Sequence, residues 1–180
     1  MEEHDVRMAI DRHWAASAGY SSCRSRAVVC FFSRGPRRRA AVSGDTMKVH
    51  GACHCGRITY EAEIDPAQVG VCHCTDCQVL TGSVYRVALP VARADFRLLS
   101  GQPRTYVKIA DSGNRRRHSF CGDCGSPVHA AADVDDPPSY ALRVGCLRER
   151  AALPPQRQKW CRSALPWVEK IGDLPGTEAQ

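Results

Sequence analysis

No apolar run in this sequence of 180 residues is long enough to cross a membrane. The longest, AVVCFF, covers only residues 27–32, and no small-residue cleavage site of a signal peptide stands out near it. There is also no Ser-His-Asp arrangement, phosphate-binding glycine loop or dinucleotide fingerprint. We therefore expect neither a membrane partner nor an enzyme of the classes that depend on those motifs.

Aromatic residues are scarce as well, at 7% of the chain, and none are interleaved with the basic runs Arg37–Arg39 and Arg115–Arg117. Stacking on aromatic side chains is a common way of binding single-stranded nucleic acid. The lack of aromatic residues among the basic runs therefore counts against nucleic-acid binding. The formal charge of +6 would fall to about +3 if seven cysteine thiolates held two zinc ions. Nucleic acid is therefore not the partner that we expect.

Cysteine, by contrast, is abundant. The chain has eleven, an odd number, and seven of them fall in CxC or CxxC groups. This spacing is typical of metal ligation in a reducing compartment, whereas a disulfide framework is typical of secreted chains. We expect a cytoplasmic zinc protein. A disulfide or redox CxxC pair is the alternative, although three nested groups exceed what one redox pair needs.

The residue pattern of the sequence changes at Met47. Residues 1–46 show no sustained helix or strand period, and we interpret them as a disordered N-terminal extension, including the possibility of a start codon assigned too early. The alternative is a short helix over residues 5–17 that packs on the domain. Residues 47–175 form the predicted domain, and residues 176–180 a tail.

Within the domain, short candidate strands are separated by glycine and proline. In residues 57–64 the side chains of Ile58, Tyr60, Ala62 and Ile64 alternate onto one face. Further strands are predicted over residues 84–89, 96–99, 105–109, 117–120, 127–130 and 140–144, and a helical turn over residues 75–80. We expect a single, mainly β domain of short antiparallel strands with few short helices.

The clustered cysteines divide into four and three. A closed structural zinc site takes four ligands, often two from each of two turns. The CxxCG turn supplies two thiols, and the CxC pair at the start of the domain is its natural partner, so we assign the structural zinc to Cys53, Cys55, Cys121 and Cys124. The remaining triplet, Cys72, Cys74 and Cys77, leaves one coordination position open, as catalytic zinc sites do.

Other residues compete weakly for these roles. His54 or His73 could replace a thiol as a ligand, although each is flanked by sulfur donors, and a supporting or surface role is the alternative. Cys146 and Cys161 stand alone and are more typical of small buried residues.

The motifs GACHCGRITYEA, CHCTDCQVLTGS and FCGDCGSPVHA, in this order and spacing, resemble the glutathione-dependent formaldehyde-activating enzyme family, which includes centromere protein V. The resemblance covers residues 47–175. It implies a zinc-bearing β fold similar to methionine sulfoxide reductase B. It also implies a structural zinc and a catalytic zinc, two per chain, on the same cysteines that the spacing assigns.

The activity implied by the resemblance is that of a carbon–sulfur lyase, an S-(hydroxymethyl)glutathione synthase. A small thiol such as glutathione would add to formaldehyde or another small aldehyde at the open zinc site. Glutathione carries two carboxylates that need polar donors. Candidates for such substrate contacts are Gly82, Ser83, Ser112, Asn114, Arg115 and Arg117. A solvated strand face is the alternative interpretation of the arginines. The alternative function is a non-catalytic zinc module that binds protein or nucleic acid.

Overall fold

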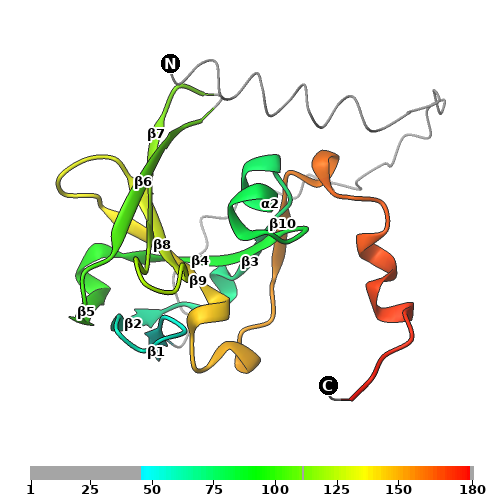
Figure 1. Cartoon of the computed structure of the whole chain (residues 1–180), viewed down its shortest axis with the longest axis horizontal. Coiled ribbons are helices and arrows are strands. Elements are labelled where there is room, and N and C mark those ends of the chain that lie inside the picture. The colour runs from blue at the N-terminus through cyan, green and yellow to red at the C-terminus, as the bar shows by residue number, and fades with distance from the viewer. Residues whose placement is uncertain (1–45, 111, 179–180) are drawn as a thin grey trace, which may run out of the picture. The chain divides into compact units, whose positions relative to one another are not determined.

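The computed structural model describes residues 46–110 and 112–178 of the chain (Figure 1). The N-terminal extension predicted over residues 1–46 lies, except for its last residue, outside the described part. The described residues form two β-sheets, a single α-helix and several short 3-10 helices. The prediction of a mainly β domain is confirmed. No helix in the described residues is long and apolar enough to cross a membrane.

The smaller sheet has three antiparallel strands in the order β1-β2-β5: β1 (Met47–Ala52), β2 (Thr59–Ile64) and β5 (Phe96–Ser100). The alternation predicted for residues 57–64 is confirmed, because Ile58, Tyr60, Ala62 and Ile64 are all buried. The strand itself begins at Thr59. Residues of the other face point outward. One of them, Glu61, forms ion pairs with Lys48 and Arg97.

The larger sheet has seven strands in the order β10-β3-β4-β9-β8-β7-β6. Its members are β3 (Gly70–Cys72), β4 (Arg86–Ala92), β6 (Arg104–Ile109), β7 (Arg115–Phe120), β8 (Pro127–Ala132), β9 (Ser139–Arg143) and β10 (Arg157–Lys159). All neighbouring pairs are antiparallel except β10 and β3, which are parallel. Strands β4 to β9 match six predicted strands to within a few residues, whereas β1, β3 and β10 were not predicted as separate strands.

The helix α2 (Thr75–Thr81) follows β3 and matches the predicted helical turn. It begins after Cys74, whose backbone is extended, and ends at Gly82, whose φ of 60° is the left-handed conformation that favours glycine. The 3-10 helices are Pro66–Gln68, Arg93–Asp95, Val144–Cys146, Arg150–Ala152, Cys161–Ser163 and Val168–Asp173.

The core lies where residues of the two sheets pack together. It includes Val49 and Tyr60 from the smaller sheet and Leu89, Val128 and Leu142 from the larger one, all at most 1% exposed. Tyr60 lies opposite Gly51 in the β1–β2 ladder, and a Cβ atom at Gly51 would overlap its ring. Glycine is required there because the tyrosine ring occupies the space of a side chain.

Candidate metal centres

Four cysteines from two distant turns converge at one point. Cys53 and Cys55 lie in the turn between β1 and β2, and Cys121 and Cys124 lie in the turn between β7 and β8. All four sulfur atoms lie within 4.8 Å of one another. The Sγ–Sγ distances are 3.5 Å between Cys53 and Cys55 and 3.7 Å between Cys55 and Cys121. A tetrahedral zinc with bonds of ~2.3 Å places its sulfurs about 3.8 Å apart, so the arrangement fits this ion.

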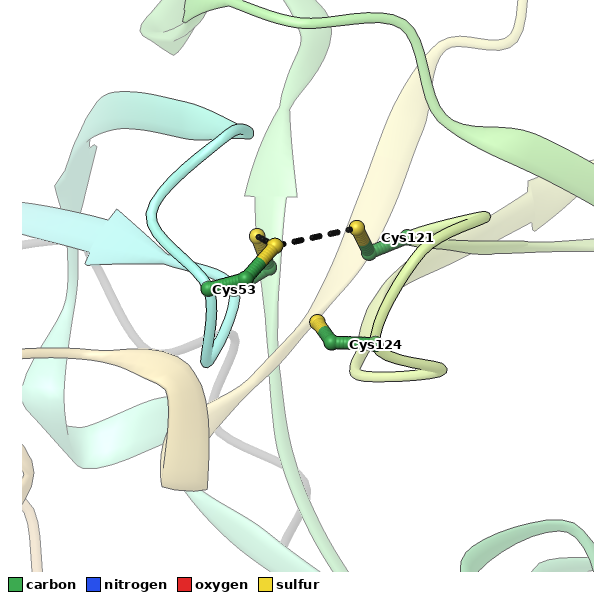
Figure 2. A group of neighbouring side chains, drawn as sticks. Cys53, Cys121 and Cys124 are labelled. Atoms are coloured by element: carbon green, nitrogen blue, oxygen red, sulfur yellow. Dashed lines mark hydrogen bonds between the residues drawn. The ribbon is translucent and has the colours of Figure 1, made fainter.

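Figure 2 shows Cys121 and Cys124 directed from one turn toward the turn that carries Cys53. The two turns are linked by Ser126, whose hydroxyl oxygen accepts a hydrogen bond from the backbone N–H of His54 at 3.0 Å. The same oxygen lies 3.3 Å from Cys124 Sγ. Hydrogen bonds from the Ser126 hydroxyl and backbone N–H lower the pKa of Cys124 to about 5. This turn therefore favours the thiolate, the form that binds a metal.

Cys53 is held in a different way. It is 4% exposed, and its sulfur accepts a hydrogen bond from the backbone N–H of Ile58 at 3.3 Å. A further backbone bond from Gly56 to the Cys53 carbonyl closes the turn, and Gly56 has the left-handed φ of 77° that this closure requires. The CxC turn thus directs both thiols to one side, as its short spacing indicated.

The other three clustered cysteines form a second group. Cys72 ends β3, Cys74 precedes α2, and Cys77 lies within α2. Their sulfurs lie within 4.8 Å of one another, with 3.6 Å between Cys72 and Cys74. Burial raises the pKa of Cys77 to about 12, although the charge of Arg86 acts in the opposite direction. Among the described residues, neither group includes a histidine, aspartate or glutamate beside its cysteines.

The segment that carries this triplet is tied to the C-terminal part of the domain. His73 is 3% exposed, and its Nε2 lies 2.8 Å from Gln158 Oε1, while its backbone N–H donates to the Lys159 carbonyl. Gln78 in α2 donates from Nε2 to the carbonyls of His73 and Ser163. His73 therefore supports the loop through a side-chain partner of its own. His54, the other candidate, is exposed.

The predicted substrate contacts lie in several places. Gly82 ends α2 and Ser83 follows it, while Ser112 and Asn114 are exposed in the turn before β7. Arg115 and Arg117 both donate to the carboxylate of Asp133, Arg115 at 2.9 Å to Oδ2 and Arg117 at 3.0 Å to Oδ1. Their carboxylate partner is thus already within the chain. The assignment of these six residues to substrate binding stays a prediction.

Two residues that the sequence interpretation did not select are Arg86 in β4 and Arg143 in β9. They are 5% and 6% exposed, and the Nε atom of each is buried without a hydrogen-bond partner. Their signal in the sequence is an arginine within an otherwise apolar strand, as in VYRVAL and YALRV. Such a position is unusual because burial of a charge is costly.

Comparison with known proteins agrees with the motifs. The sequence model of the glutathione-dependent formaldehyde-activating enzyme family matches residues 48–163. No curated protein is detectably similar to the chain. A crystal structure of a Rhodobacter sphaeroides protein is similar, with 24% identity and a TM-score of 0.47, over 63% of this chain and 100% of that one.

Proposed function

Because the chain belongs to the glutathione-dependent formaldehyde-activating enzyme family, we propose that it is a zinc-dependent carbon–sulfur lyase. Its reaction would be the addition of a small thiol, such as glutathione, to formaldehyde or another small aldehyde. The observation that supports this most directly is the convergence of Cys72, Cys74 and Cys77 without a fourth ligand among the described residues. We further propose that the reducing cytoplasm, which keeps such thiols free, is where it works.

The two clusters would take different roles. The closed group of four thiols joins two turns that are 66 residues apart in the chain, at Cys55 and Cys121, and we assign it a structural zinc. The group of three leaves a position for an exogenous ligand, and we assign it the catalytic zinc. A zinc ion held by Cys72, Cys74 and Cys77 would supply a positive centre that favours the thiolate form of a sulfur ligand.

The reaction needs no further reagent. The substrate sulfur forms a bond to the carbonyl carbon, the carbonyl π bond breaks, and the thiol proton ends on the new hydroxyl group. The chain would contribute by holding the thiol and the aldehyde together in a fixed orientation. The contacts of Gln78 with the carbonyls of His73 and Ser163 keep the cysteine-bearing segment in place for this purpose.

The test is the rate of exchange between formaldehyde and its glutathione adduct at equilibrium, measured by NMR with and without the zinc-loaded protein. We expect exchange faster than the spontaneous rate, and its loss in Cys74→Ser. Cys161→Ser is the matched control, because Cys161 is an exposed cysteine outside both groups. Exchange at the spontaneous rate with glutathione and with other small thiols would contradict the proposal and favour a non-catalytic zinc module.

A further inference from the structure

Arg86 and Arg143 are the two buried arginines of the described domain, and neither pairs with a carboxylate in residues 46–110 or 112–178. The arginines that do form ion pairs are far more exposed; Arg97, for example, is 69% exposed. Removing a guanidinium from water without an anionic partner is energetically unfavourable, as it is for any buried ion. Two such groups that act on each other electrostatically therefore indicate a site suited to an anion.

The sheet register places both arginines on the face that carries Cys72. Arg86 lies opposite Cys72 in the β3–β4 ladder, and Arg143 lies opposite Ala88 in the β4–β9 ladder. Residues that are paired across strands share a face, as do residues two apart on one strand. Cys72, Arg86 and Arg143 consequently project to the same side of the larger sheet.

The same register extends to His118. Ala141 pairs with Ala130, and Ala130 pairs with His118, so this histidine shares the face as well. Its Nδ1 lies 3.3 Å from a terminal nitrogen of Arg143, which leaves the other donors of that guanidinium for a ligand. The alanines between the arginine and the histidine on this face bring no charge that could neutralise either arginine.

The charged groups that act on this part of the face are mainly cationic. Burial, followed by the charges of Arg143, Arg86, Lys108 and Arg116, lowers the pKa of His118 to about 3. The histidine is therefore neutral and accepts from Arg143. Burial and the charge of Arg86 lower the pKa of Arg143 to about 9. The acid that faces this region from α2 is Asp76, which pairs with Lys108.

The two arginines act on the cysteine sulfurs through their charge and not through hydrogen bonds. Neither guanidinium makes a hydrogen bond to a sulfur of the described residues, although Cys77 and both arginines influence one another electrostatically. The unsatisfied donors at Nε thus lie near the triplet without belonging to it.

We propose that Arg86 and Arg143 form an anion-binding subsite next to the three-thiol group, and that it takes a carboxylate of the thiol substrate. This inference rests on the proposed function for the identity of the ligand. Two guanidinium groups with free donors suit a carboxylate, which accepts paired N–H bonds in one plane. The subsite would hold the substrate by a carboxylate that is distant from its sulfur. It would therefore select acidic thiols over neutral ones.

The first experiment changes the ligand and leaves the protein intact. Glutathione and its diethyl ester are compared as substrates of the zinc-loaded protein in the exchange measurement. We expect KM for the ester to be about 10- to 100-fold higher, because charged hydrogen bonds of this kind are lost. Equal KM values would overturn the inference while leaving the proposed function standing.

The second experiment changes the arginines and uses a probe that has no thiol. S-methylglutathione keeps both carboxylates, and its binding is measured by calorimetry at low salt to Arg86→Gln and Arg143→Gln. We expect each variant to bind about 10-fold or more weakly, Arg86→Lys to recover part of the loss, and Arg97→Gln to bind as the unchanged protein does. Arg97 is the matched control because it is exposed and paired with Glu61 in the other sheet.

The outcomes separate the two proposals. Loss of S-methylglutathione binding in the arginine variants, with no catalysed exchange of any thiol, would support the subsite and reject the enzyme. Equal loss of glutathione and ester binding in Arg86→Gln would mean that the arginine acts on the thiolate, which overturns the carboxylate assignment. If the buried variants do not fold, the comparison of acid and ester in the unchanged protein still decides.

Discussion

The hydroxyl oxygen of Ser126 lies 3.3 Å from the sulfur of Cys124, and it also accepts the backbone N–H of the opposite turn, at His54. One side chain thus joins the two turns of the four-thiol group and stabilises a thiolate in it. Groups that orient metal ligands in this way influence affinity nearly as strongly as the ligands themselves.

Ser126→Ala should therefore weaken zinc binding at the four-thiol group by about 10- to 100-fold. The measurement is competition with a chromophoric chelator at pH 7. Ser139→Ala is the control, since Ser139 is exposed in β9. An affinity unchanged by Ser126→Ala would mean that the hydroxyl contributes nothing to the site.

Zinc content tests the division into two groups. The protein purified under reducing conditions should hold two zinc ions per chain, one for each group of thiols. Cys74→Ser should hold one and stay folded, whereas Cys124→Ser should lose stability with its zinc, because it opens the link between two distant turns. Elemental analysis and circular dichroism measure both effects. Unfolding of Cys74→Ser would make the triplet structural.

Gly51 provides a prediction about packing. Gly51→Ala should reduce the free energy of unfolding by about 1–3 kcal/mol or more, because the new methyl group overlaps the buried Tyr60 ring. Denaturant titration measures this loss. Gly145→Ala is the matched control, since a Cβ there meets no atom within 4 Å, and its effect should stay within about 0.5 kcal/mol. Equal effects of the two substitutions would reject the explanation.

His129 should make the domain sensitive to acid. Its ring packs against Phe96 and Tyr140 at centroid distances of 5.4 and 4.8 Å, and burial lowers its pKa to about 4. In the unfolded chain the pKa is ~6.5, so below that pH the unfolded state binds a proton that the folded state does not. The contribution of His129 is thus complete above pH ~6.5 and is lost as the pH falls toward 4.

The test compares unfolding free energies of the unchanged protein and His129→Phe between pH 7 and pH 4. As the pH falls, the unfolding free energy of the unchanged protein should decrease relative to that of the variant by up to about 1.4 kcal/mol per pH unit. Protonation of the clustered thiols affects both proteins alike and cancels in the difference. Parallel curves would show that His129 does not titrate differently on folding.

Several elements could be predicted because their signals are local. The alternation from Ile58 to Ile64 specifies a half-buried strand, and the strand has that buried face. The glycine at position 82 marks the end of helix α2, and its φ is positive there. Strand β10 had no such signal: Arg157–Lys159 is polar and exposed throughout, and it pairs in parallel with β3 across 87 residues of chain, at Arg157 and Gly70.

What the sequence by itself determined is which thiols are neighbours along the chain, and from this it predicted a division into four and three. Short spacings such as CxC and CxxC bring the sulfurs of one turn together. The convergence of the two turns at Cys55 and Cys121, 66 residues apart, was decided by the tertiary structure. The tertiary structure alone decided that Arg86, Arg143 and His118 share a face with Cys72. That relationship depends on the register of strands distant in the chain, and a shift of one residue would turn those side chains to the opposite face.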